Sequence, residues 1–120
     1  ANRVCGFVNA NSLFQRVVPY CLDCKVDIEI YNRNRIDLYN KLTELGFKCV
    51  KPVGAFYMFP ETPIDDDVAF CNAAKEFNLL LVPGSGFGCK GHMRLSYCVS
   101  HDTIINSFPA FEKLAAKFIK

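Results

Sequence analysis

The sequence has little net charge and no long apolar run. Its 14 lysines and arginines nearly balance its 12 aspartates and glutamates, which gives a formal net charge of +2 at pH 7. So small an excess gives no electrostatic reason to expect binding to nucleic acid or to an anionic membrane surface. No stretch of the chain approaches the roughly 20 apolar residues that a membrane-spanning helix needs. We therefore expect neither a nucleic-acid partner nor a membrane partner.

The sequence also lacks the residue spacing of a metal site. Cys21 and Cys24 form a single C-x-x-C pair, whereas a structural zinc site needs a second pair of ligands. The other cysteines, His92 and His101 show no such spacing. Acidic residues within and after the pair disfavour a thioredoxin-like motif. We expect no metal ion, and a redox role for this pair is the weaker alternative.

The seven cysteines are an odd number and are scattered along the chain. Four of them fall at periodic apolar positions, where a reduced thiol behaves as a small hydrophobic side chain; these are Cys5, Cys49, Cys71 and Cys98. Such usage is typical of a protein in a reducing compartment. We therefore expect free thiols and a cytoplasmic location.

What the sequence does contain is the pattern of a small globular domain. Hydrophobic residues make up 51% of the chain and charged residues 22%, which suits one domain with a real core. Apolar residues at helical spacing predict a helix over residues 27–45, and Gly46 supplies its stop signal. A second helix follows the acidic run 65–67, because acids favour the first turn of a helix, and its buried stripe comprises Val68, Cys71, Ala74 and Phe77. A third helix begins near Ser100, and its apolar stripe comprises Ile104, Phe108, Phe111, Leu114 and Phe118.

Four segments have the pattern of strands. Residues 47–51 and 55–59 flank a Pro-Val-Gly turn, which predicts an antiparallel hairpin. Residues 79–82 form a short apolar run, and residues 93–99 alternate between apolar and polar side chains. Mixed helices and strands in this order predict an α+β two-layer sandwich, in which helices cover a small, mostly antiparallel sheet.

A glycine-rich loop separates the last two predicted strands. Four glycines within residues 84–91 indicate a backbone that needs positive φ angles or a close approach. Three of them satisfy G-x-G-x-x-G, but a dinucleotide fingerprint must open a helix, and here a strand follows. A P-loop needs Ser or Thr after its lysine, whereas Lys90 precedes Gly91. Neither phosphate-binding motif therefore fits.

Arg94 is the strongest candidate for a binding residue. It lies near the start of a predicted strand, on the face opposite Met93, Leu95 and Tyr97. A buried guanidinium without a partner is very costly, and its planar fork suits a carboxylate or a phosphate. Spacing alone favours a salt bridge to an acidic residue of the chain over a ligand, and both interpretations remain open at this point.

Two motifs of the chain resemble those of a known family. The segment VPGSGFGCKGHMRLSYCVS resembles the C-terminal signature of class I/II pyridoxal-phosphate aminotransferases, V-P-G-x-x-F followed by G-x-x-R-L-S-Y. Residues 54–60, GAFYMFP, resemble the G-x-F-Y segment of the same family. The resemblance extends from about Gly6 onward. It implies the small domain of the aspartate aminotransferase-like fold over residues 25–120, and the end of the large domain over residues 1–24.

The resemblance also implies a function for the intact enzyme. Such enzymes use pyridoxal phosphate to move an amino group between an amino acid and a 2-keto acid, and they act as homodimers. By motif position Arg94 would bind the substrate α-carboxylate, with Phe87 and Phe56 close to the substrate. A pyridoxal-phosphate lyase, for example a carbon–sulfur lyase, and a stand-alone, non-catalytic α+β binding domain remain as alternatives.

No lysine of this chain lies in a setting that resembles the family's cofactor lysine. The chain also begins at Ala1 rather than at a methionine. We therefore expect an incomplete part of an enzyme, which alone neither binds the cofactor nor catalyses; the cofactor lysine would lie upstream. The apolar stripe of Phe14, Val17, Val18 and Cys21 would then lack its large-domain cover, so we expect this segment to be misplaced, swapped or dimerised.

Overall fold

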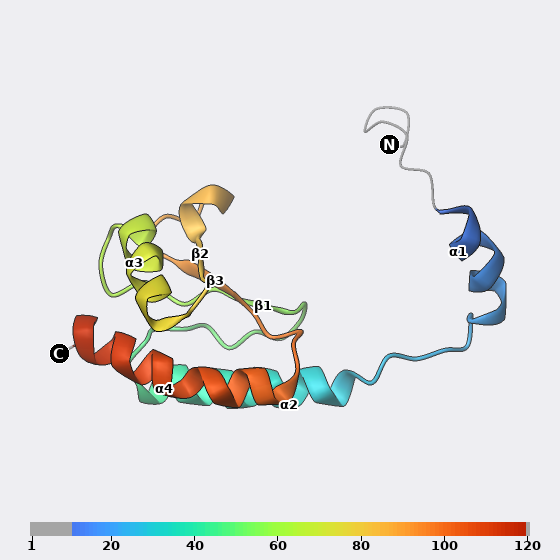
Figure 1. Ribbon diagram of the computed structural model, residues 1–120, viewed down its shortest axis with the longest axis horizontal. Coiled ribbons are helices and arrows are strands. Elements are labelled where there is room, and N and C mark those ends of the chain that lie inside the picture. The colour runs from blue at the N-terminus through green and yellow to red at the C-terminus, as the bar shows by residue number, and fades with distance from the viewer. Residues whose placement is uncertain (1–10, 120) are drawn as a thin grey trace.

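The structure is a computed structural model and describes residues 11–119. Helix α1 (Ser12–Val17) and the 3-10 turn η1 (Val18–Tyr20) lie apart from the other elements (Figure 1), to which an irregular segment over residues 21–27 joins them. The radius of gyration is 17.7 Å, whereas a compact domain of this length has about 14 Å. The position of α1 away from the other elements contributes to the difference. The expectations for Cys5 and for the start of the resemblance at Gly6 lie outside the described residues.

Helix α2 (Ile28–Glu44) forms where the sequence predicts it. The Asp27 side chain caps its first turn by accepting a hydrogen bond from the Glu29 backbone N–H at 3.0 Å. Leu38 and Leu42 are buried on one face. The helix ends at Glu44, and Gly46 just beyond it has a φ of +88°, in the left-handed region that glycine adopts at little cost.

Helix α4 (His101–Phe118) lies along α2. Ser100 is its N-cap, as the sequence predicts. The expected apolar stripe is inward: Ile104, Phe111 and Leu114 are buried, and Phe108 and Phe118 are partly buried. The two helices therefore share one hydrophobic interface.

Helix α3 (Asp67–Ala74) continues into the 3-10 turn η2 (Lys75–Phe77), and Asn78 ends it at a φ of +60°. Cys71 and Ala74 are buried, as predicted. Val68, which we expected on the same buried stripe, is 47% exposed. The prediction is wrong there because the inward position in the first turn is taken by the side chain of Asp67.

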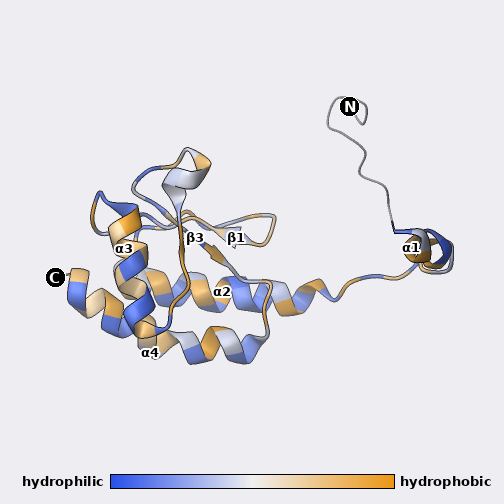
Figure 2. Ribbon diagram, turned by 45° about the horizontal axis from the view of Figure 1, so that its top comes forward, coloured by the Kyte–Doolittle hydropathy of each residue, from blue (hydrophilic) through white to orange (hydrophobic). Residues whose placement is uncertain are grey.

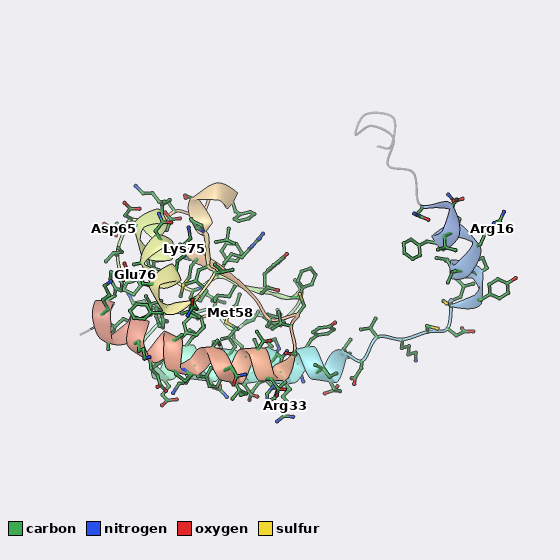
Figure 3. All side chains as sticks on the ribbon, viewed as in Figure 1. Arg16, Arg33, Met58, Asp65, Lys75 and Glu76 are labelled. Atoms are coloured by element: carbon green, nitrogen blue, oxygen red, sulfur yellow. The ribbon has the colours of Figure 1, made fainter. Side chains whose placement is uncertain are left out.

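Three short strands form one antiparallel sheet. They are β1 (Tyr57–Met58), β2 (Val82–Pro83) and β3 (Met93–Ser96), in the order β1-β3-β2. Tyr57 is opposite Ser96, and Val82 is opposite Arg94. Met58, Met93 and Leu95 are buried on the inner face; Met58 is labelled in Figure 3. The small antiparallel sheet packed against helices confirms the α+β prediction.

The predicted hairpin between residues 47–51 and 55–59 does not form. Residues 47–51 are not a strand; the Phe47 N–H instead bonds to Leu42 at the end of α2. The later segment does contain a strand, but only the two residues of β1, and this strand pairs with β3. Tertiary pairing with a strand far along the chain therefore prevails over the local turn signal.

Two side chains that donate hydrogen bonds to backbone carbonyls hold the segment before β1 and the end of β3 in place. The buried Asn34 amide donates hydrogen bonds to the carbonyls of Tyr97 and Val99 at 3.1 and 2.8 Å. The Tyr97 hydroxyl donates to the Ala55 carbonyl at 2.7 Å, just before β1. Helix α2, the end of β3 and the segment leading into β1 are thereby held together.

Some features can be stated only for residues 11–119. The six cysteines in this range are free thiols, and burial raises the pKa of Cys49 and of Cys71 to about 11. No helix within this range is long and apolar enough to cross a membrane. The same part of the chain contains no group of three His, Cys, Asp or Glu side chains that could hold a metal ion.

Candidate functional site

The outer face of the sheet carries the candidate site. We use this name for the face opposite the core, which comprises Tyr57, Val82, Arg94 and Ser96. Arg94 lies on the middle strand, directly opposite Val82 and diagonal to Tyr57. The alternation of β3 therefore turns Met93 and Leu95 into the core and the guanidinium away from it.

Two aromatic rings lie against the Arg94 guanidinium. Its Cζ is 4.4 Å from the ring centre of Tyr57 and 4.2 Å from the ring centre of Phe87. A guanidinium at this distance from an aromatic face is attracted by the ring quadrupole. Both rings therefore attract the guanidinium and favour its position on the outer face of the sheet.

The salt bridge that spacing alone favoured does not form within residues 11–119. The ion pairs within residues 11–119 involve other cations, and Arg94 is in none of them. Burial is only partial at Arg94, so solvent can hydrate the N–H groups. Of the two interpretations of Arg94, the ion pair with an acidic residue is therefore not seen in this part of the chain.

The glycine-rich loop carries Phe87 to this position. Residues Gly84–Phe87 form the 3-10 turn η3, and Gly88 and Gly91 both have a φ of +74°. Gly84 donates its N–H to the His92 carbonyl at 2.8 Å. A Cβ on Gly84 would overlap the Cys89 carbonyl oxygen and lie 2.9 Å from the His92 carbonyl oxygen. The loop thus depends on a close backbone approach at Gly84 and on positive φ angles at two other glycines.

Asp67 ties this loop to helix α3. Asp67 is only 2% exposed, and its carboxylate accepts a hydrogen bond from the Ser85 backbone N–H at 2.6 Å. This bond holds the pKa of Asp67 below its ordinary value of 3.8, and the charge of Lys90 contributes in the same direction. The sequence indicated only that acids favour this first turn. Asp66 does act as the cap, by accepting from the Ala69 N–H, but the role of Asp67 in the loop was missed.

Phe87 contacts Arg94 directly, whereas Phe56 packs against Tyr57, which in turn contacts Arg94. The ring centre of Phe56 is 4.5 Å from that of Tyr57. Phe56 also lines a groove of about 600 Å³ between the start of α2 and the segment before β1. The structure therefore brings Arg94 and Phe87 into contact and connects Phe56 to them through Tyr57. Sequence analysis missed Tyr57 at this site, although the alternation of a strand paired with β3 would have placed it beside Arg94.

The lysines within residues 11–119 do not fit the role of a lysine that binds pyridoxal phosphate. Lysines within residues 11–119 are exposed to solvent, except for Lys41. Lys41 pairs with Glu112 at 2.7 Å, and this hydrogen bond raises its pKa, which keeps the amine charged. None of them is a buried, neutral amine of the kind that forms a Schiff base.

These features coincide with a family-level match. A family model described as aminotransferase class I and II matches residues 15–107. The chain belongs to this aminotransferase family.

Individual relatives agree with this assignment. An aspartate aminotransferase from Geobacillus stearothermophilus is 43% identical over 76 residues, which are 56% of this chain and 19% of that protein. An aspartate/prephenate aminotransferase from Thermus thermophilus is 37% identical over 74% of this chain and 24% of its own length. The chain thus spans about a fifth to a quarter of the length of these relatives.

Solved structures show the same fold. A structure of an amino transferase from Eubacterium rectale superimposes with a TM-score of 0.85 at 48% identity, over 98% of this chain and 30% of that one. An aspartate aminotransferase from Thermus thermophilus, solved with maleate, gives a TM-score of 0.69 at 36% identity over 72% of this chain and 23% of that chain.

Proposed function

We propose that this chain is the C-terminal part of a pyridoxal-phosphate-dependent aminotransferase, and that it supplies the arginine that binds the substrate α-carboxylate. The observation that carries the proposal is the state of Arg94. It lies at the arginine of the R-L-S-Y motif, on the outer face of the sheet, against two aromatic rings and outside every ion pair described in residues 11–119. A cation held in this way is suited to an anionic ligand.

The proposed domain division follows from the packing. Residues 25–120 would be the small domain, a two-layer sandwich, and residues 1–24 would be the end of the large domain. The hydrophobic side chains of α1 and η1 are exposed, and Figure 2 shows the α1 ribbon away from the other elements. The match to the Eubacterium rectale structure extends over 98% of the chain, which supports an outlying α1 as the arrangement within a longer protein.

Arg94 would contribute binding and orientation to the reaction. Its fork can donate two parallel hydrogen bonds to one carboxylate, and this fixes the direction of the Cα–H bond in the bound amino acid. Pyridoxal phosphate, when bound, supplies the electron sink for the reaction. Residues 11–119 do not supply its lysine, so we assign the cofactor contacts to the preceding part of the protein.

The names of the relatives support a shared carboxylate site. They include aspartate, prephenate and aromatic amino acids, which differ in the side chain but not in the need to bind a carboxylate. Because these relatives are aminotransferases, they favour amino transfer over the lyase alternative. Their greater length disfavours a stand-alone binding domain. We further propose a cytoplasmic homodimer for the intact enzyme.

The test is to express the chain together with the sequence that precedes it in its gene. With pyridoxal phosphate present, this protein should transfer the amino group of aspartate or an aromatic amino acid to a 2-keto acid. Arg94→Ala should raise KM for both substrates by at least tenfold. The proposal is wrong if the protein eliminates rather than transfers the amino group, or if Arg94→Ala leaves both KM values unchanged.

A further inference from the structure

Arg94 is a flexible side chain that must present its N–H edge in one direction. An arginine loses much rotamer freedom when it is fixed. In residues 11–119 no side-chain oxygen pairs with its guanidinium. The neighbours that fix its orientation are instead the faces of Tyr57 and Phe87.

We infer that Tyr57 and Phe87 are positioning residues for Arg94, and that Asp67 is the anchor that holds Phe87 in place. We call the two rings the aromatic clamp. The inference rests on the proposed function and deepens it, because it names the residues that prepare the arginine for a carboxylate. None of the three needs to touch the substrate.

The two rings reach Arg94 from independent elements. Tyr57 is placed by the register of β1 on β3, in which Tyr57 lies opposite Ser96 and diagonal to Arg94. Phe87 comes from the η3 turn, before β3 in the sequence. The ring of Phe59 meets that of Phe87 at 6.0 Å in a T-shaped contact, which supports Phe87 from another side. The clamp therefore depends on both the sheet and the loop.

The geometry suits a planar ligand. Aromatic rings attract a guanidinium over their faces, and a guanidinium can stack with its flat surface on a ring, which leaves its N–H edge open. A carboxylate binds in the plane of the guanidinium, at that edge. Rings at 4.4 and 4.2 Å can therefore fix the arginine without competing with the carboxylate for its donors.

Phe87 needs an anchor because it is 52% exposed and belongs to a glycine-rich loop. The Ser85 N–H, two residues earlier, donates to the Asp67 carboxylate at 2.6 Å. Asp67 is buried, and its position in the first turn of α3 is fixed by the helix. The carboxylate thus acts on Arg94 through the loop and through Phe87, not by direct ion pairing.

The experiment uses the longer protein with pyridoxal phosphate bound. Maleate, a dicarboxylate that does not react, serves as the binding probe, and its Kd is measured along with kcat and KM. Phe87→Leu and Tyr57→Leu remove a ring but keep an apolar side chain, and each should raise the Kd of maleate and KM about three- to tenfold. kcat should change less, because the residues that would carry the chemistry remain. Asp67→Ala should have the same effect as Phe87→Leu and should add little to it in the double mutant.

Two controls accompany these variants. Phe87→Tyr keeps the ring face and should bind maleate like the wild type. Phe108→Leu removes a ring from beneath Lys41, at 6.0 Å on the far helices, and should leave the Kd of maleate unchanged. It makes the same chemical change as Phe87→Leu at a cation–aromatic contact outside the site.

The decisive comparison is a double-mutant cycle with Arg94→Ala. If the clamp acts through Arg94, Phe87→Leu should have no further effect once Arg94 is alanine. An equal effect of Phe87→Leu in both backgrounds would overturn the clamp, and so would an unchanged maleate Kd in Phe87→Leu while Arg94→Ala binds weakly. In both cases the proposed function stands. Unchanged maleate binding in Arg94→Ala would overturn the proposed role of Arg94 and the clamp together.

Discussion

At the scale of single residues, Arg94 illustrates how the environment separates a binding arginine from a structural one. A structural arginine on a sheet is generally satisfied by a carboxylate of its own chain, whereas Arg94 lies against two rings and has no ion pair within residues 11–119. Its removal should therefore affect function far more than folding. The same distinction can be tested with lysine, which keeps the charge but loses the planar fork.

In the longer protein, Arg94→Lys should lower kcat/KM for amino and keto acids by roughly ten- to a hundredfold, since one charge-assisted hydrogen bond contributes about 1.5–3 kcal/mol. The melting temperature should hardly change. Steady-state kinetics and thermal melting of the same samples measure both. A large fall in melting temperature together with a near-normal kcat/KM would instead make Arg94 a structural residue.

Asp67 makes stability depend on pH in a defined direction. Its pKa in the folded protein is lowered from 3.8, so the ionised carboxylate stabilises the fold above the pKa of the unfolded chain. That contribution is lost as the pH falls through the lowered folded value. In Asp67→Asn the amide oxygen remains, but the titrating charge is absent.

The wild type should therefore melt at a higher temperature than Asp67→Asn at pH 7, and the difference should shrink as the pH is lowered below 4. Thermal melting of both proteins between pH 3 and pH 7 measures the difference directly. Asp65→Asn is the control, because Asp65 is exposed in the same acidic run. A difference that grows toward acid pH would show that the Ser85 hydrogen bond does not favour the ionised form.

At the scale of elements, the glycine-rich loop has one glycine packed closely against other backbone atoms and another with open space beside it. Gly84 lies against the carbonyls of Cys89 and His92, whereas a Cβ on Gly86 would meet no atom within 4 Å. Neither glycine has a positive φ. Alanine substitutions at these two positions therefore separate the effect of steric crowding from the effect of replacing a glycine.

Gly84→Ala should destabilise the protein by about 1–3 kcal/mol, because the backbone of the loop must move to accept the methyl group. The movement should also displace Phe87 and weaken binding by Arg94. Gly86→Ala should change stability by less than about 0.5 kcal/mol. Urea denaturation of both variants provides the comparison, and equal stabilities would mean that the loop adapts freely around Gly84.

The helices could be predicted from the sequence because their signals are local. Asp27, Gly46 and Ser100 mark helix ends within a few residues of the atoms they contact. The pairing of β1 with β3 could not, since the partners are far apart and each strand is too short to show a clear period. The strand predicted over residues 47–51 rested on the local pattern and on the turn that follows it, and neither reports which strand it would pair with.

The residues of the candidate site likewise fall into those that could be predicted from the sequence and those that could not. Arg94 and Phe87 could be selected from motifs that lie within one stretch of sequence. Tyr57 could not be placed beside them without the register of β1 on β3. Asp67 acts on a backbone N–H 18 residues away, and a backbone donor leaves no mark in the sequence.

At the scale of the whole molecule, the exposed α1 is the feature with the clearest consequence. Leu13, Phe14 and Val18 are more than half exposed, and Figure 3 shows α1, with Arg16 labelled, far from the sheet. Apolar surface of this kind is normally covered by a partner. In the proposed enzyme, the large domain would cover it.

The chain on its own should therefore self-associate, or its α1 should exchange amide hydrogens rapidly. Replacing Phe14 and Val18 by serine should shift light scattering toward the monomer, while the matched pair Asn11→Ser and Gln15→Ser should not. A monomer whose α1 and η1 amides are strongly protected from exchange would contradict this expectation.

The charge on the outer face of the sheet should also affect the rate at which an anionic ligand associates. Since Arg94 has no anionic partner among residues 11–119, its field extends into the solvent and attracts approaching anions. Such attraction raises the rate of encounter and is screened within a Debye length of about 8 Å at physiological ionic strength. An anionic ligand should thus associate more slowly as salt is added, while its dissociation, which is governed by short contacts, should respond much less.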